Sequence, residues 1–166
     1  IGKLGVADRR ALARHPALHS SLHASTTHDD GERQRKPSWP AASSSFVGRA
    51  AECAQLLDAV TAHRMVTATG PGGVGKTRLA LRVVESFAAA RRDGGFFVDL
   101  AHVADPAMVV SAVAAAAGVV APLGGSLSQA LAAALKSSDA VVVLDNCEHV
   151  IDAVRDCAAH LLEACA

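Results

Sequence analysis

The stretch GPGGVGKT, residues 70–77, decides the fold that this sequence predicts. It follows a short apolar run of β type, residues 65–69, and precedes an amphipathic helical pattern that includes Leu79, Val83 and Phe87. The stretch fits the pattern GxxxxGK[ST], which requires a strand before it and a helix after it. Both neighbours are expected here, so we interpret the stretch as a loop that cradles phosphate groups.

The residue types in this loop suit a polyphosphate and its metal ion. Glycines adopt main-chain conformations closed to other residues and leave room for a phosphate beside the N–H groups. The following helix adds unpaired N–H donors, Lys76 would reach the β- and γ-phosphates, and Thr77 would offer a hydroxyl to Mg²⁺. The expected nucleotide-binding residues are Gly70, Gly72, Gly73, Val74, Gly75, Lys76, Thr77 and Arg78.

A second motif supplies the magnesium side of the expected site. Residues 140–144 form a continuous apolar run, typical of a strand buried on both faces, and Asp145 ends it. Ligands bind at the carboxyl ends of the strands in α/β sheets, so Asp145 would lie at the same edge as the loop. We expect Thr77 and Asp145 to hold Mg²⁺, with Asp145 also counted among the catalytic residues. The alternative interpretation makes Asp145 a helix cap.

Glu148 has two interpretations of equal weight. It could polarise an attacking water as a general base. It could equally cap the helix that is expected to start near His149, because an acid is favoured in a first helical turn. Asn146 occupies the position at which many related ATPases carry a second acid, so we expect any hydrolysis to be slow.

The rest of the chain alternates helical and strand patterns. Helices are expected at residues 53–60, 106–117, 126–136 and 150–162, and a further strand at residues 96–100. Such alternation implies parallel strands joined by right-handed crossovers. The expected fold class is therefore α/β, a three-layer P-loop NTPase fold with a parallel sheet.

The composition favours a domain with an apolar core and no membrane segment. Apolar residues make up 51% of the 166 residues, and the net charge is zero. The most apolar stretch, residues 109–121, is shorter than the roughly 20 residues that a membrane helix needs. We expect no membrane contact and a cytoplasmic location. The cysteines lack CxxC spacing and are expected to be small core or surface residues: Cys53, Cys147, Cys157 and Cys165.

Residues 1–45 show no apolar periodicity and are expected to be a disordered or linker-like leader, apart from a short helix at residues 8–14. They carry seven Lys/Arg against four Asp/Glu. That balance is typical of a solvated linker and is also compatible with contact to nucleic acid. A recurrence of His15, His19 and His23 could place metal ligands on one helix face, but Pro16 disfavours a stable helix there.

Four ordered motifs resemble those of a known family. They are FVGR at 46–49 with Glu52, GPGGVGKTRLAL at 70–81, FVDL at 97–100 and VVLDNCEHV at 142–150. Together they resemble the NB-ARC-like signal-transduction ATPases, the STAND class. The likeness is greatest to the ATPase module of bacterial transcriptional regulators of the LuxR and antibiotic-regulatory types. Since the resemblance covers residues 46–166, the N-terminal part of an NB-ARC/AAA-like P-loop domain is expected there.

The resemblance implies further contacts and partners. In that family the Val-Gly-Arg segment lies beside the adenine and ribose, so Val47, Gly48 and Arg49 become expected base-side contacts. Without the resemblance, a helix N-terminal turn with a surface arginine is the preferred interpretation. Family members are switches, ADP-bound when silent and ATP-bound when assembled, with transcription or defence as output. The implied partners are a nucleotide, other domains of a parent protein and further copies of it, with no direct DNA binding from this segment.

One departure from the family concerns the sheet. The family's strand with a phosphate-sensing arginine comes after the last helix seen here and inserts between the P-loop strand and the Asp145 strand. The chain ends before such a strand, so we expect a fragment that is incomplete at the C-terminus and lacks a backbone partner for the two neighbouring strands. Unpaired buried backbone groups are costly, which would leave the fragment marginally stable and aggregation-prone.

The leading functional expectation is an ATP/ADP-binding switch module with slow, Mg²⁺-dependent ATP hydrolysis in a multidomain signalling or transcriptional regulator. One alternative is an interaction fragment of such a regulator that is inactive on its own. Another is a P-loop small-molecule kinase. A kinase would need a lid with arginines after the P-loop helix, and residues 109–134 contain no arginine.

Overall fold

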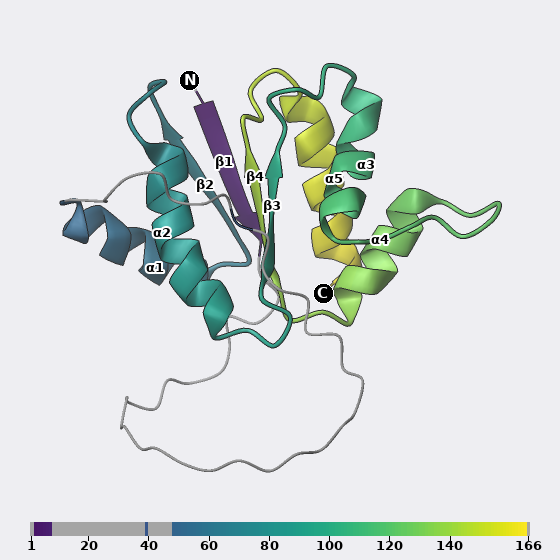
Figure 1. Cartoon of the computed structure of the whole chain (residues 1–166), viewed down its shortest axis with the longest axis horizontal. Helices are drawn as coiled ribbons and strands as arrows, with labels where there is room; N and C mark the ends of the chain where they lie inside the picture. The colour runs from purple at the N-terminus through teal and green to yellow at the C-terminus, as the bar shows by residue number, and fades with distance from the viewer. Residues whose placement is uncertain (1, 8–38, 40–47, 166) are drawn as a thin grey trace, which may run out of the picture.

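The computed structural model describes residues 2–7, 39 and 48–165, with residues 2–7 described as backbone. Helices and strands alternate as expected from residue 50 onward (Figure 1), and the fold is α/β. In chain order the elements are β1 (Gly2–Ala7), α1 (Ala50–Ala62), β2 (Met65–Gly70), α2 (Lys76–Ala89), β3 (Gly95–Asp99), the 3₁₀ helix η1 (Pro106–Met108), α3 (Val109–Ala116), α4 (Leu127–Lys136), β4 (Val141–Asp145) and α5 (Ile151–Ala164).

The four described strands form one sheet in the order β2-β1-β4-β3. The neighbouring strands β4 and β3 are parallel, with Asp99 opposite Asp145. By contrast, β1 runs antiparallel to both of its neighbours, with Gly2 opposite Gly70 on β2 and Gly5 opposite Leu144 on β4. The expectation of a purely parallel sheet is therefore wrong for β1.

Strand β1 also corrects two expectations about the ends of the chain. Residues 2–7 were expected to belong to a leader without regular structure, yet they form a strand. That strand fills the place between β2 and β4 that we expected to lack a partner (Figure 1), so backbone groups on their facing edges are paired. Backbone pairing, which is open to any sequence without proline, explains how so weakly patterned a segment can form a central strand. The expected helix at residues 8–14 and the three-histidine pattern lie outside the described residues.

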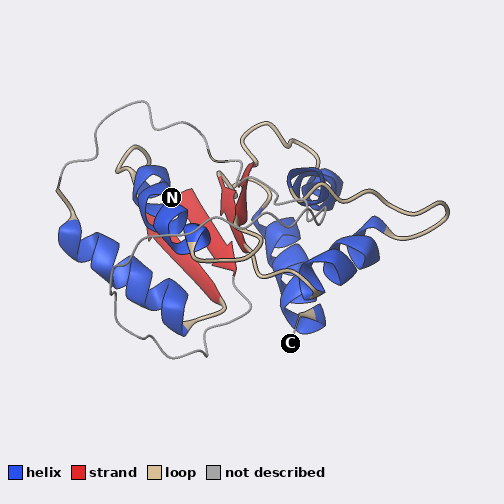
Figure 2. Ribbon diagram, turned by 60° about the horizontal axis from the view of Figure 1, so that its bottom comes forward, coloured by secondary structure: helices blue, strands red, loops and turns tan. Residues whose placement is uncertain are grey.

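Helices cover both faces of the sheet and give two apolar cores (Figure 2). Strand β4 is buried on both sides and contributes to each. Its Val141 and Val143 pack with α1 and α2, around Val60 and Val84. On the other face, the alternate residues Val142 and Leu144 pack with α3, α4 and α5. The alternation of side chains along a strand places them in different cores, and the result is the expected layered arrangement.

Local capping signals account for the starts of α4 and of the 3₁₀ helix η1. Ser126 caps α4, because its hydroxyl accepts a hydrogen bond from the N–H of Gln129. Asp105 caps the 3₁₀ turn η1 in the same way, and Pro106 occupies the first position of that turn. The helix expected at 106–117 thus begins as a 3₁₀ turn and continues as α3. Strand β3 lies one residue earlier than expected, and Leu100 follows it as a fully buried residue.

Polar contacts tie the elements together at the amino ends of β3 and β4. Arg91 Nη1 lies 3.1 Å from Asp139 Oδ1, and the Arg91 guanidinium stacks over the ring of Phe87 at 4.4 Å from its centroid. Asp93 Oδ2 accepts a hydrogen bond of 2.6 Å from the N–H of Asp139. We call this group the Arg91–Asp139 lock. It holds the segments that precede the two strands against each other.

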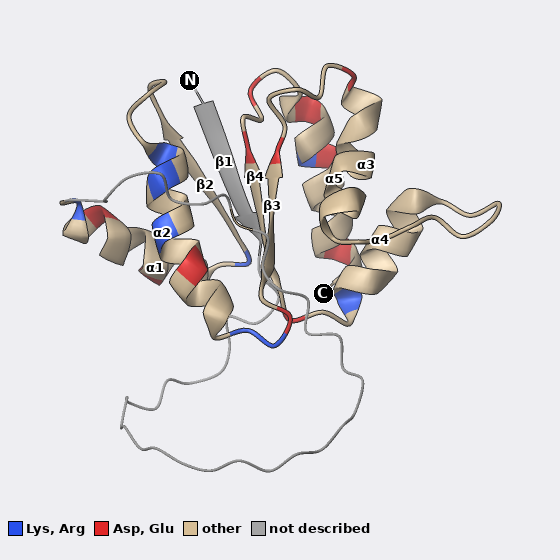
Figure 3. Cartoon of the chain, viewed as in Figure 1, with Lys and Arg blue, Asp and Glu red and all other residues tan. Residues whose placement is uncertain are grey.

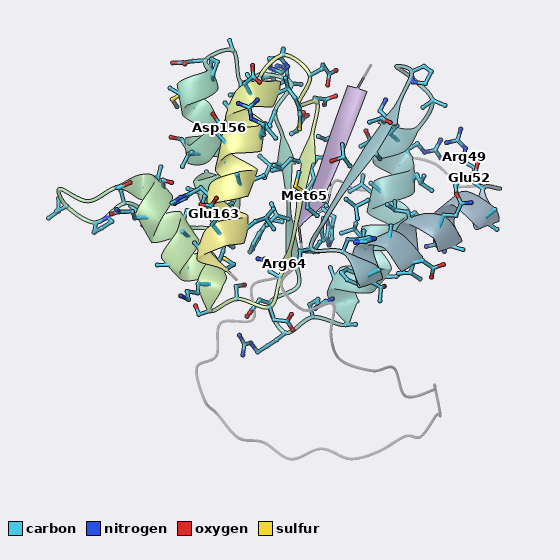
Figure 4. The ribbon with its side chains drawn as sticks, turned by 180° about the vertical axis from the view of Figure 1, so that it is seen from behind. Arg49, Glu52, Arg64, Met65, Asp156 and Glu163 are labelled. Atoms are coloured by element: carbon cyan, nitrogen blue, oxygen red, sulfur yellow. The ribbon has the colours of Figure 1, made fainter. Side chains whose placement is uncertain are left out.

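One further side chain links elements on opposite sides of the sheet. Arg64, which is labelled in Figure 4, lies in the turn between α1 and β2 and donates from Nη2 to the carbonyl oxygen of Leu162 at 2.8 Å. Cations are favourable near the C-terminal end of a helix, where carbonyl groups lack partners. Within the part of the chain that the structure describes, none of the helices combines the length and apolarity that crossing a bilayer requires.

Candidate functional site

Three strands bring their carboxyl ends to one edge of the sheet. Strand β4 is parallel to β3 and, since β1 is antiparallel to both β2 and β4, it is also parallel to β2. The edge therefore collects Gly70 from β2, Asp145 from β4 and Asp99 from β3. Figure 3 shows acidic residues at the ends of β3 and β4 and basic residues on the first part of α2. This is the edge at which α/β sheets bind ligands.

The loop between β2 and α2 has the conformation that its glycines predict. Gly73 and Gly75 have φ angles of 72° and 85°, in the left-handed region that disfavours other residues. No atom lies within 4 Å of where a Cβ would stand on Gly72 or Gly73. Helix α2 starts at Lys76 without a side-chain cap on its first N–H groups. The loop thus leaves open space beside uncapped helical N–H donors, which is a suitable environment for an anion.

Lys76 folds back across this loop. Its ammonium Nζ donates to the carbonyl oxygens of Gly70 and Pro71 at 3.1 and 2.9 Å. Its Cδ and the Cγ1 of Val74 both lie within 4 Å of the Cβ position of Gly70. The positive charge is therefore held at the loop by two neutral carbonyl acceptors. A phosphate would replace them with charged acceptors, which form stronger hydrogen bonds.

Thr77 and Asp145 meet across the edge. The Thr77 hydroxyl donates to Asp145 Oδ2 at 2.6 Å, and the N–H of Asn146 donates to Asp145 Oδ1 at 2.9 Å. Asp145 is only 5% exposed. Neither oxygen accepts from an N–H of α5, whose N-cap is Val150, so the structure contradicts the alternative in which Asp145 caps a helix. The two residues expected to hold Mg²⁺ are thus in direct contact.

A neighbouring carboxylate, Asp99, belongs to the FVDL motif but was not among the expected site residues. Its Oδ1 accepts from the Nδ2 of Asn146 at 2.7 Å and from the N–H of Ala101 at 2.9 Å. The hydrogen bond from Asn146, followed by that from Ala101, lowers the pKa of the Asp99 carboxyl below its ordinary value. The sequence does contain an indication of this residue, because Asp99 ends a second strand that runs parallel to the strand of Asp145.

Glu148 lies in the turn between β4 and α5 and is exposed. Helix α5 begins at Ile151, one residue after the start of the expected range 150–162, and no side chain caps its first turn. The structure therefore contradicts the alternative in which Glu148 caps this helix. The preceding residue, Cys147, is buried. Burial, together with the nearby carboxylates of Asp145 and Glu148, raises the pKa of the Cys147 thiol to about 12.

Arg49 approaches the phosphate loop from the start of α1. It has a left-handed backbone with φ 58°, after Gly48 with φ 83°. Its guanidinium Nη1 lies 3.7 Å from the Cβ position of Gly75. Figure 4 shows Arg49 beside the start of α2. The structure thus brings Arg49 to the loop itself. Of the other expected contacts, Arg78 is exposed in the first turn of α2, and Val47 lies outside the described residues.

The described residues suit a magnesium ion that a nucleotide brings with it. They contain no group of three or more His, Cys, Asp or Glu side chains able to hold a metal. Mg²⁺ commonly takes only one or two protein ligands and completes its shell with water and substrate phosphates. The hydroxyl of Thr77 and the carboxylate of Asp145, next to an open anion site, fit that requirement.

Comparison with known proteins decides the family. A family model described as "AAA domain" matches residues 60–165, which contain the whole phosphate loop and Asp145. The chain belongs to the AAA domain family. AAA domains are P-loop NTPase domains, which generally bind a nucleotide together with Mg²⁺. The α/β fold and the loop geometry described above are consistent with that membership.

Relatives of this AAA domain include regulatory proteins. It is 41% identical over 103 residues to a protein of Mycobacterium tuberculosis (strain ATCC 25618 / H37Rv) named as a candidate HTH-type transcriptional regulator, covering 62% of this chain and 12% of that protein. It is 36% identical over 121 residues to an uncharacterized protein of the same strain, covering 73% of this chain and 31% of that protein. Regulatory protein AfsR of Streptomyces coelicolor is 36% identical over 124 residues, covering 66% of this chain and 12% of AfsR.

This AAA domain accordingly spans less than a third of the length of each of these relatives. No solved structure matches the chain.

Proposed function

We propose that this AAA domain is an ATP/ADP-binding switch module with slow, Mg²⁺-dependent ATP hydrolysis. The observation that carries the proposal is the 2.6 Å contact between Thr77 and Asp145 beside a loop whose glycines leave room for phosphate. A glycine-rich turn that only connects a strand to a helix would not require an acidic residue at the end of another strand. The combination of an anion site and two oxygen ligands for a hard cation is the requirement for a magnesium nucleotide.

Each part of the nucleotide has residues suited to it. The loop backbone from Gly70 to Gly75, the first turn of α2 and the ammonium of Lys76 bind the phosphates. Arg49 lies close enough to the loop to add a second positive charge there, which extends the base-side role implied for Gly48 and Arg49. Further contacts are assigned to Val47, Val74 and Arg78.

Thr77 and Asp145 would hold the ion, and the ion, when bound, neutralises charge that develops on the phosphates. Glu148 is suited to accept a proton from an attacking water, because it is exposed three residues after Asp145 and does not cap α5. Asn146, directly after Asp145, offers an amide where a second acid would accept a proton. The absence of that acid supports slow hydrolysis.

The regulatory context of the proposal rests on the relatives. Two of them carry names of regulators, and this chain spans only a small share of their length. We assign the domain to the NB-ARC-like STAND class, starting near residue 46, within a multidomain cytoplasmic regulator of transcription or signalling. Its partners would be the other domains of that protein and, in the ATP-bound state, further copies of it.

Replacing Lys76 tests the proposal. In the full chain, Lys76→Ala should weaken the binding of magnesium ATP and ADP by about a hundredfold, because charge-assisted contacts contribute about 1.5–3 kcal/mol each. Isothermal titration calorimetry measures the dissociation constant. The matched control is Lys136→Ala, which removes an exposed lysine from the last turn of α4. Equal affinity of both variants for the nucleotide, or no binding by the unmodified chain, would refute the proposal.

A further inference from the structure

A chain of hydrogen bonds crosses the nucleotide edge from β3 to α2. Asp99 accepts from the side chain of Asn146 at 2.7 Å, and Asn146 donates its backbone N–H to Asp145 Oδ1 at 2.9 Å. Asp145 Oδ2 then accepts from Thr77 at 2.6 Å. These hydrogen bonds join four residues from β3, α2 and the end of β4. Of the four, only Asp99 lies outside the motifs of the phosphate loop and the Asp145 strand.

The turn after β4 needs such support. Asn146 has a φ angle of 56°, a left-handed conformation that few residues other than glycine and asparagine adopt readily. In this conformation its N–H points at the carboxylate of the preceding Asp145. Its side-chain amide points the other way and donates to Asp99. The parallel register that sets Asp99 opposite Asp145 brings the acceptor within reach.

Asp99 is itself fixed in place. The N–H of Ala101 donates to the same Oδ1 at 2.9 Å. The N–H of Leu100 donates to the carbonyl oxygen of Asp145 at 3.0 Å. Nearby, a ring nitrogen of His149 lies 3.0 Å from the carbonyl oxygen of Val103, which joins the same two segments a second time. The segment after β3 therefore forms a rigid support for the turn after β4.

We propose that Asp99 is a positioning residue for the magnesium side of the site: by holding the Asn146 side chain, it fixes the turn that directs the Asp145 carboxylate at Thr77. The inference rests on the proposed function. A merely structural role fits less well, because Asp99 is exposed and satisfies no buried donor that would otherwise lack a partner. Loss of a partner that orients a metal-binding side chain commonly lowers metal affinity by about ten- to a hundredfold.

The test measures how strongly Mg²⁺ improves ATP binding. Isothermal titration calorimetry on the full chain gives the dissociation constant of ATP with Mg²⁺ and with EDTA, and their ratio is the magnesium gain. Asp99→Ala should lower this gain about tenfold and leave the affinity in EDTA unchanged. Asp99→Asn keeps an oxygen acceptor for Asn146 and should restore most of the gain. Asp105→Ala is the matched control, since it removes an exposed acid whose turn contact goes to the N–H of Ala107 and not to Asn146.

A double variant examines the route through Asn146. If Asp99 acts through this side chain, Asp99→Ala combined with Asn146→Ala should lose no more magnesium gain than Asn146→Ala alone. Additive losses would overturn the inference, as would an Asp99→Ala variant with the gain of the unmodified chain. Equal weakening of ATP binding with and without Mg²⁺ would show a general structural role and would also overturn it. An unmodified chain that binds no ATP would instead refute the proposed function, and with it this inference.

Discussion

The hydroxyl of Thr77 donates a hydrogen bond of 2.6 Å to Oδ2 of Asp145, a residue 68 positions further along the chain. The contact joins the first turn of α2 to the end of β4, in a sheet where β1 lies between β2 and β4. Each partner arrives from a rigid element, so their distance is set by the fold rather than by a loop. Two oxygens that suit a hard cation are thus brought together by the fold.

Substitution of Thr77 should separate metal binding from phosphate binding. Thr77→Ala removes the hydroxyl and should weaken ATP binding in Mg²⁺ by about tenfold or more, with little change in EDTA. Thr77→Ser keeps the hydroxyl and should behave like the unmodified chain. Titration calorimetry in the two buffers measures the difference. A Thr77→Ala variant with unaltered magnesium dependence would remove Thr77 from the set of metal ligands.

Two neighbouring glycines should respond differently to alanine. Gly73 has φ 72°, so Gly73→Ala should lower the free energy of unfolding by about 1 kcal/mol through backbone strain. Gly72 has no positive φ and equally open surroundings, so Gly72→Ala should be close to neutral for stability. Urea unfolding followed by circular dichroism compares the two. Equal stability of both variants would argue against the described loop conformation.

The sequence predicted well those parts of the structure that have strong local signals. The glycine loop, the apolar run before Asp145 and the helical periodicities each depend on nearby residues, and their elements lie within about three residues of the expected positions. The meeting of Thr77 with Asp145 followed from the rule that ligands gather at the carboxyl ends of parallel strands. That rule requires no knowledge of side-chain detail.

Features set by long-range pairing could not be predicted in this way. The segment GKLGVA contains two glycines and too few β-branched residues to indicate a strand, and its place depends on pairing with residues about sixty and about 140 positions away. The contact between Asp99 and Asn146 depends on the register of β3 against β4, which the sequence does not specify. Arg49 reaches the loop because of its left-handed backbone, for which a non-glycine residue gives no clear signal.

Proline in β1 should destabilise the whole sheet. Val6 lies opposite Val66 on β2 and Val143 on β4, and proline removes a backbone N–H that a central strand needs for pairing. Val6→Pro should lower the free energy of unfolding by about 1–3 kcal/mol, the cost of leaving a buried backbone group unpaired. Val6→Ala serves as the control for loss of the side chain. Faster hydrogen exchange at β2 and β4 amides should accompany the proline effect, and unchanged exchange would contradict the pairing of β1.

The Arg91–Asp139 lock should affect stability without affecting ligands. Its charged atoms are partly exposed, with 12% and 25% of the two side chains accessible, so solvent screens the pair. Arg91→Ala should lower the free energy of unfolding by about 1 kcal/mol, at the upper end of the range for such ion pairs. Because the lock lies at the edge opposite the site, ATP affinity should stay the same. A changed affinity in this variant would indicate coupling between the two edges.

The cysteines should differ in their reactivity toward alkylating reagents. Burial, with the nearby carboxylates, raises the pKa of Cys147 to about 12, and burial also raises the pKa of Cys157. At pH 8 both thiols are protonated and hidden, so iodoacetamide should modify them far more slowly than Cys53 and Cys165, which are partly exposed. Mass spectrometry of the native protein over time checks the order. Rapid modification of Cys147 would indicate that the turn after Asp145 opens in solution.

The reversed direction of β1 has a practical consequence for handling the protein. Because Gly2 pairs with Gly70, the backbone at the start of the chain lies next to the first residue of the phosphate loop, while α5 ends on the far side of the molecule (Figure 1). An affinity tag or fluorescent protein joined to β1 ahead of Gly2 would lie close to the entrance that we propose for the triphosphate. Cloning such fusions onto the other terminus would leave that entrance clear.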